Sequence, residues 1–395
     1  MAIEIRKVEN SRQKRDFLSL PFILSGNSTD WNPPVFSEER RKADFRRNQK
    51  HDRFEKAFFV AYDIDGKPVG RIALSYDRHL SELEQENHGS WWFFDCADDP
   101  EAADALFRTA RRWFDARGVI RASGPLPPLD FPVGGFREAD SARLPFPFPS
   151  ATPGYGALAE SAGLRRGSCS LVVRLDLGSS VSDTLKKLVQ TVASYDPQMI
   201  RIPEEYTAHG SGRFLNFCRS IYSEALLSGP DREHQLRFLQ RWMIHEYTCV
   251  ATSNDRPLAF AAALSDAAPV ALAARKSLSS LPVYRNLPGF ARRIVETAWQ
   301  SLSIYAWNTM RKPPAFLSRF RSKPSDSPAI LFAGDEQPAL SAFLDTLPIA
   351  PEETPAFSTA WVVFRGLDAS KAESLSRDYG ETGCALFREY YLETE

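Results

Sequence analysis

Cysteine is scarce in this sequence, and its spacing would neither hold a metal nor build a disulfide framework. Five Cys are spread over 395 residues with no C-x-x-C pair, and the six His show no ligand-like spacing. The cysteines are Cys96, Cys169, Cys218, Cys249 and Cys384. Scattered thiols are typical of a reducing compartment. We therefore expect a cytoplasmic protein that binds no metal.

The sequence also lacks an excess of charge and a long apolar run. Its 49 basic and 50 acidic side chains leave a net charge of −1, which argues against a globally electropositive nucleic-acid binder. No stretch approaches the ~18 apolar residues of a membrane span, and residues 1–16 are too polar for a signal peptide. No G-x-S-x-G, Walker, dinucleotide or zinc motif supports a hydrolase, an NTPase or a dehydrogenase.

Proline and phenylalanine, in contrast, are abundant. The chain has 28 Pro and 27 Phe, many of them within Ser123–Phe136 and Leu144–Gly156. Proline lacks an N–H donor and fixes φ, so these segments cannot run as helices or central strands. They are too aromatic for a solvated linker. They are either structured loops packed on the core or an apolar wall of a substrate cleft.

One pattern occurs twice along the chain. Residues Phe58–Asp77 and Thr248–Asp266 each read as an apolar strand, a polar turn, a proline and a second strand with small residues. Val60-Ala61 matches Val250-Ala251, and Pro68 matches Pro257. A repeat of this kind predicts a tandem duplication of one domain, and 395 residues are enough for two domains.

The first half resembles bacterial tandem proteins of the GNAT type, the acyl-CoA N-acyltransferase superfamily, with a diverged cofactor loop. The residues that carry the resemblance are Leu20–Phe22, Asp30–Pro34, Gly66–Ile72, Phe93–Cys96, Asp98–Glu101, Gly124-Pro125 and Glu160–Leu164. The resemblance implies an α/β fold made of two tandem GNAT-like domains, each a mixed, mostly antiparallel sheet flanked by helices. We expect the first domain at residues 1–178, a connecting helix at 179–199 and the second domain at 200–395.

The pattern of the first half agrees with that fold. Gly89–Cys96 reads as a buried central strand. Asp99 and Pro100 then read as the N-cap and first residue of a helix that ends at Gly118.

The second half allows two alternatives. In one, Pro269–Ala274 is the central strand and Ser303–Trp307 the strand after its helix. In the other, which we prefer, Pro328–Phe332 is the central strand, and Thr359–Arg365 and Ala385–Leu392 are the final strands.

A GNAT enzyme binds the pyrophosphate of acetyl-CoA on backbone N–H groups where a helix begins after the central strand. In the first half this position reads Cys96–Glu101, with three acidic residues and a proline but no glycine. An anion would be repelled there, so we expect no standard CoA site in the first half. In the second half a basic turn resembles the usual R-x-x-G-x-A signature with one residue too many. Its candidate residues for acetyl-CoA or a longer acyl-CoA are Arg285, Asn286, Gly289, Ala291 and Arg292. The same pattern also fits a plain start of a helix.

Acyl transfer to an amine needs a base for the amine, an oxyanion donor and an acid for the leaving thiolate. Asp130 is a candidate for orienting the amine, although acidic residues are also common in turns. His245 is a candidate base, and Tyr155 and Tyr305 are candidate acids, unless they are buried structural residues.

Three functions are compatible with these residues. The leading hypothesis is an N-acyltransferase that moves an acyl group from acyl-CoA to the primary amine of an aromatic or apolar small molecule. The second is a peptidyltransferase-like enzyme that uses aminoacyl-tRNA and meets its phosphates with the basic residues of 311–323. The third is a non-catalytic binding protein with a degenerate GNAT fold.

Overall fold

The computed structural model describes the following residues: 3–24, 39–40, 43, 54–78, 87–125, 134–140, 144, 154–176, 198–201, 243–253, 256–264, 281–286, 295, 299, 329–333, 359–367, 370 and 384–394. Its helices are α1 (Ser11–Leu24), α4 (Pro100–Asp115), α5 (Tyr155–Ser161) and α12 (Pro282–Arg285). Its strands are β1 (Glu4–Lys7), β2 (Phe54–Tyr62), β3 (Pro68–Asp77), β4 (His88–Cys96), β5 (Arg121–Gly124), β6 (Phe136–Asp140), β7 (Arg165–Asp176), β8 (Gln198–Arg201), β9 (Met243–Ser253), β10 (Arg256–Leu264), β11 (Ala329–Ala333), β12 (Thr359–Leu367) and β13 (Cys384–Glu393).

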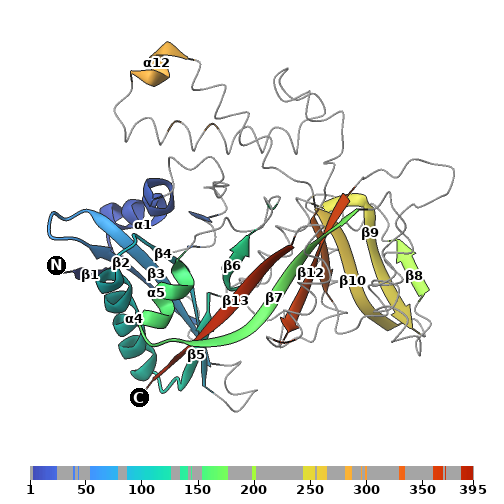
Figure 1. Cartoon of the computed structure of the whole chain (residues 1–395), viewed down its shortest axis with the longest axis horizontal. Helices are drawn as coiled ribbons and strands as arrows, with labels where there is room; N and C mark the ends of the chain where they lie inside the picture. The colour runs from blue at the N-terminus through green and yellow to red at the C-terminus, as the bar shows by residue number, and fades with distance from the viewer. Residues whose placement is uncertain are drawn as a thin grey trace.

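All of these strands belong to one mixed sheet (Figure 1). The order is β1-β2-β3-β4-β5-β13-β7-β12-β11-β10-β9-β8, and β6 pairs with β13 beside this path. Strands β1 to β4 are antiparallel neighbours, whereas β4 and β5 are parallel. The prediction of an α/β fold with a mixed, mostly antiparallel sheet flanked by helices is therefore confirmed.

The first half of the sheet is buried on both faces because its strands carry apolar side chains on both faces. Along β2, Ala57, Phe59 and Ala61 belong to the same hydrophobic cluster as the buried face of α4. Phe58 and Val60 belong to a second cluster with residues of α1. Successive side chains of a strand point to opposite faces. Helices α1 and α4 therefore cover opposite faces of the sheet.

Helix α4 begins as the sequence predicts. The Asp99 carboxylate accepts hydrogen bonds from the backbone N–H groups of Glu101 (2.9 Å) and Ala102 (3.3 Å). Pro100, at the first helical position, has no N–H that would need a partner. After the helix, Gly118 adopts a φ of 65°, which a glycine tolerates without strain. These residues fix the position of α4 directly after the end of β4.

The last strand of the chain lies in the first half of the sheet. Strand β13 is antiparallel to β5, with Tyr391 opposite Ser123, and to β7, with Leu386 opposite Leu171. On its other side β7 pairs with β12, where Val363 lies opposite Val172. In Figure 1 the red strand β13 lies beside the green strand β7. The two halves of the chain thus exchange their last strands, and the boundaries at residues 178 and 200 stay a prediction.

The second half repeats the pairing of the first. The hairpin β9–β10 is followed by β11, which is antiparallel to β10 and parallel to β12. Strands β11, β12 and β13 lie where the preferred alternative predicts them. The segments named by the other alternative, residues 269–274 and 303–307, lie outside the described residues, as does the connecting helix predicted for 179–199. The tandem duplication stays a prediction.

Candidate functional site

Strands β4 and β5 form a fork. They pair only at His88 with Arg121, Gly89 with Ala122, and Ser90 with Ser123. Beyond Ser90, β4 continues to Cys96 without β5, and β5 ends at Gly124. Backbone N–H and C=O groups that leave a strand pair need other partners. A fork of this kind can therefore receive an extended ligand that carries amide groups, or it can be filled by the protein itself.

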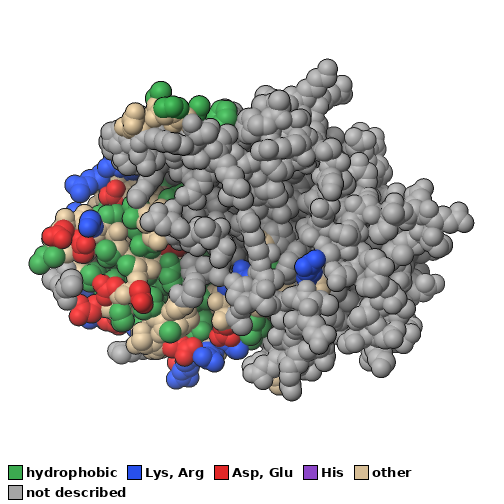
Figure 2. Space-filling model, turned by 45° about the horizontal axis from the view of Figure 1, so that its top comes forward, with side chains coloured by type: hydrophobic (Ala, Val, Ile, Leu, Met, Phe, Trp, Pro, Cys, Tyr) green, Lys and Arg blue, Asp and Glu red, His purple; other side chains and the backbone are tan. Residues whose placement is uncertain are grey.

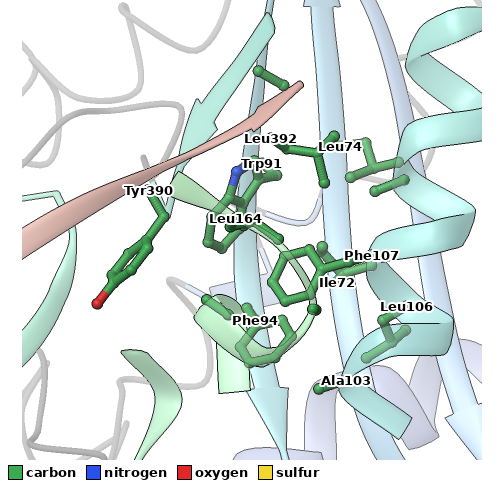
Figure 3. Packing of buried hydrophobic residues seen from close by; sticks show 14 of the residues in the cluster. Ile72, Leu74, Trp91, Phe94, Ala103, Leu106, Phe107, Leu164, Tyr390 and Leu392 are labelled. Atoms are coloured by element: carbon green, nitrogen blue, oxygen red, sulfur yellow. The ribbon is translucent and has the colours of Figure 1, made fainter. Parts of the chain in front are cut away.

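The first fork is filled by aromatic side chains, which we call the aromatic plug. It consists of Trp91, Phe94, Phe107, Phe136 and Tyr155. The Phe94 ring stacks on Phe107 at 4.8 Å and meets Tyr155 edge-on at 5.4 Å. Phe136 packs against Trp91 at 5.7 Å and against Phe94 at 5.6 Å. Figure 3 shows Trp91, Phe94 and Phe107 gathered on the α4 side of the sheet.

The plug also supplies a hydrogen-bond partner to the part of β4 that no longer pairs with β5. The Cys96 N–H donates a hydrogen bond to the Tyr155 hydroxyl at 3.1 Å. Burial raises the pKa of Tyr155 well above its usual value, and the nearby Asp95 charge adds to the rise. Gly124 faces the plug closely, because a Cβ there would lie 2.3 Å from the Trp91 ring. The candidate acid Tyr155 thus lies in a closed environment, where its hydroxyl satisfies a buried backbone donor.

The turn before α4 is unfavourable for an anion. Burial raises the pKa of the Cys96 thiol to about 12, and the carboxylates of Asp99, Asp95 and Asp98 add to the rise. At the start of the helix the Asp99 carboxylate already occupies two N–H groups, which would otherwise bind a phosphate. The absence of a standard CoA site in this half stays a prediction.

A buried ion pair lies at a bulge in β4. Two residues of β4, Phe93 and Phe94, oppose one residue of β3, and Phe93 has a φ of 50°. Beside them Arg71, which is 3% exposed, hydrogen-bonds Asp95 at 2.6 Å and lies 3.6 Å from the Glu39 carboxylate. Burial raises the pKa of Asp95 even though the Arg71 charge lowers it. This pair closes the opposite face of the same strand.

The second half contains a matching fork between β11 and β12. These strands pair only at Ala329 with Trp361 and at Ile330 with Val362, and β11 then continues to Ala333. Across β10, the fork lies level with an irregularity in β9. Ala262 and Ala263 of β10 pair with Thr248 and Ile244, so residues 245–247 bulge out of the ladder. Strand spacing places this bulge about 10 Å from the fork.

His245 is the first residue of that bulge, so the structure brings one predicted catalytic residue level with the second fork. Arg285 is the last residue of the short helix α12, and Asn286 follows it. The remaining predicted residues lie outside the described residues; they are Asp130, Gly289, Ala291, Arg292 and Tyr305. The roles of all nine residues stay predictions.

The sequence reasoning missed the role of Arg71 as the buried partner of Asp95. Phe136 was visible as the end of a Pro- and Phe-rich segment, but nothing local indicated that it packs on Phe94. Within the described residues, no cluster of His, Cys, Asp and Glu could hold a metal ion. No helix in this described part is both long enough and apolar enough to cross a bilayer.

Comparison with known proteins gives partial matches to two curated bacterial proteins. The chain is 28% identical over 196 residues to Protein YghO of Escherichia coli, a match that covers 48% of each chain. It is 29% identical over 124 residues to the bacterial ceramide synthase of Caulobacter vibrioides, covering 31% of this chain and 32% of that protein. The chain thus spans about half or less of the curated relatives it matches. No family model matches it.

Solved structures similar to this chain include two GCN5-related N-acetyltransferases. One is the glucosamine N-acetyltransferase region of a fungal multi-domain GH3 beta-N-acetylglucosaminidase, with a TM-score of 0.48, 12% identity and coverage of 99% of this chain and 38% of that chain. The other comes from Anabaena variabilis, with a TM-score of 0.44, 10% identity and coverage of 99% and 72%.

Proposed function

We propose that the protein is an N-acyltransferase that takes an acyl group from acyl-CoA and passes it to the primary amine of an apolar small molecule. In this proposal the donor binds at the fork between β11 and β12, and the first half is structural. The observation that carries the proposal is the contrast between the forks. The first is filled by the aromatic plug and bordered by acidic residues, whereas the second repeats the strand pairing with a bulge at its level.

The second fork suits an acyl-CoA for a physical reason. The pantetheine arm of CoA carries two amides, and an extended amide chain can hydrogen-bond to the backbone edges of two diverging strands. The N–H groups of β11 beyond Ile330 would also be placed to hydrogen-bond the thioester carbonyl. Such donors stabilise the negative charge that develops on this oxygen when an amine attacks.

The proposed residues divide the chemistry among them. His245 would accept the proton of the attacking amine while the new C–N bond forms. The C–S bond then breaks, and Tyr305 would protonate the leaving thiolate. Arg285 and Arg292 would pair with the phosphates of the donor. No redox partner or metal is required for this sequence of steps.

The acceptor class is suggested by one relative and by composition. A ceramide is the N-acyl derivative of a long-chain amino alcohol, and the Caulobacter relative is named as a ceramide synthase. The Pro- and Phe-rich segments of this chain could line an apolar acceptor site. An amine with a long alkyl chain is therefore the acceptor that we propose.

The direct test is a thiol-release assay with acetyl-CoA and long-chain acyl-CoAs against short and long alkyl amines. We expect release that depends on both substrates and is fastest with the long amines.

His245→Gln should lower kcat by about 10²–10⁴, with His88→Gln on β4 as the matched control. Arg285→Glu should raise KM for the donor, with Arg108→Glu on α4 as its control. The absence of thiol release with every acyl-CoA would overturn the proposal and favour aminoacyl-tRNA as donor or a non-catalytic role.

A further inference from the structure

Exposed apolar side chains are concentrated in one short stretch of the chain. Among the described residues six large apolar side chains are exposed, and three of them lie within Leu281–Val295. Leu281 is 51% exposed, Val283 76% and Val295 38%. Figure 1 places α12 at the outer edge of the molecule, away from the sheet, and Figure 2 shows hydrophobic atoms along the same edge. Clustered exposure of this kind marks an interaction surface more often than single exposed residues do.

The charge around this stretch has one sign. Between Asp266 and Asp326 the sequence has ten basic residues and a single acidic one, Glu296. This segment therefore carries +9, and the rest of the chain carries −10, since the total is −1. The basic residues are Arg275, Lys276, Arg285, Arg292, Arg293, Arg311, Lys312, Arg319, Arg321 and Lys323.

We propose that the α12 surface, defined as Leu281, Pro282 and Val283, docks on an anionic lipid bilayer. Exposed Leu and Val side chains would enter the boundary between headgroups and acyl chains, while the basic residues of the segment other than Arg285 and Arg292 would meet lipid phosphates. The same segment contains seven aromatic residues, a type enriched at membrane interfaces. The positive charge of the segment could also bind a nucleic acid, but a nucleic acid would not explain why Leu281 and Val283 are exposed.

This inference goes beyond the proposed acyl transfer, and its test needs no activity. It does bear on the acceptor, because an amine with a long alkyl chain resides in a membrane. An enzyme held at the bilayer surface meets such a substrate at a high local concentration. If the unmodified protein did not bind vesicles but still acylated a soluble short-chain amine, the docking inference alone would be wrong and the proposed acyl transfer would stand.

The experiment is co-sedimentation of the full chain with vesicles. We expect binding to vesicles of phosphatidylglycerol mixed with phosphatidylcholine, weaker binding at about 0.5 M salt because the charges are screened, and little binding to phosphatidylcholine alone. The double variant Leu281→Ser/Val283→Ser should reduce the partition coefficient at least about tenfold. Ile64→Ser is the matched control, because Ile64 is 75% exposed in the β2–β3 turn; it should leave the binding unchanged.

Four results would overturn the inference. One is the absence of binding to anionic vesicles, and another is an equal loss of binding in the Ile64→Ser control. The third is salt-sensitive binding of tRNA without vesicle binding, which would assign the basic segment to a nucleic acid. A dimer in gel filtration that the double variant dissociates, without vesicle binding, would assign the surface to a second copy of the chain.

Discussion

The two forks of the sheet share one pattern of strand pairing, and the structure describes a different feature beside each of them. In the first fork, the backbone N–H of Cys96 on β4 donates a hydrogen bond to the Tyr155 hydroxyl. Phe136 packs beside Phe94 in the same fork. In the second, the parallel pair separates after Ile330 and Val362, level with a bulge that contains His245. The first fork is thus closed by the protein's own side chains, and the second is the one at which we propose the chemistry.

The exchanged strands make the first half depend most strongly on β13. We expect that removing Cys384–Glu395 prevents folding of the first half, because β5, β6 and β7 would lose their partner. The deletion also removes the buried side chains of Phe387, Tyr390 and Leu392. The loss would exceed the ~5–15 kcal/mol that typically stabilises a domain. Circular dichroism and limited proteolysis would measure it, with removal of Glu395 alone as control. A cooperative melt of the truncated chain at the original temperature would contradict the exchange.

Opening the aromatic plug should produce the next largest effect. Phe136→Ala removes a ring that is 5% exposed and packs on Trp91, Phe94, Tyr155 and Tyr390. We expect a loss of ~3–5 kcal/mol in the free energy of unfolding, since the cavity cannot close fully. Phe136→Leu keeps more of the volume and should cost roughly 1–1.5 kcal/mol. Equal effects of the two variants in urea denaturation would show that the ring does not fill the fork.

Tyr155 allows the structural and catalytic interpretations to be separated. Tyr155→Phe leaves the buried Cys96 N–H without its acceptor, and we expect a loss of about 1–3 kcal/mol in stability. Ser161→Ala, on the same helix α5, is the control for a less buried hydroxyl. If the variant keeps its stability but loses kcat in the thiol-release assay, Tyr155 belongs to the catalytic machinery instead.

The smallest predicted effect concerns alkaline pH. Burial raises the pKa of Tyr390 above its usual value, and the charges of Glu138 and Glu160 add to the rise. The folded state therefore holds this proton more tightly than the unfolded state does. The stabilisation is complete below the unfolded pKa of about 10 and is lost as the pH rises through the folded value.

Tyr390→Phe removes this contribution, so its melting temperature should fall less steeply than that of the wild type above about pH 10. Thermal melts between neutral and alkaline pH would measure the difference. Parallel curves for the two proteins would show that Tyr390 ionises equally in both states.

Local patterns predicted much of the first half. The Asp99-Pro100 pair fixed the start of α4, and the apolar run of Gly89–Cys96 gave the central strand because both of its faces are buried. The preferred alternative also named β11, β12 and β13 in the second half.

Long-range pairing was beyond the reach of these patterns. Nothing near Cys384 indicates that β13 lies beside β5, because the partners are more than 250 residues apart and the pairing depends on the whole sheet. The short strand β6 could not be predicted for a related reason, because its pairing partner is β13. For the site, residue types suggested His245, but only the register of β9 and β10 placed it level with a fork.

The central claim is that acyl-CoA binds at the second fork and not at the first. Hydrogen–deuterium exchange with and without a long-chain acyl-CoA tests it directly. We predict slower exchange in peptides that cover β11 and β12, residues 329–333 and 359–367, and unchanged exchange in β4 and β5. Protection of β4 and β5, or no protection anywhere at saturating acyl-CoA, would contradict the account.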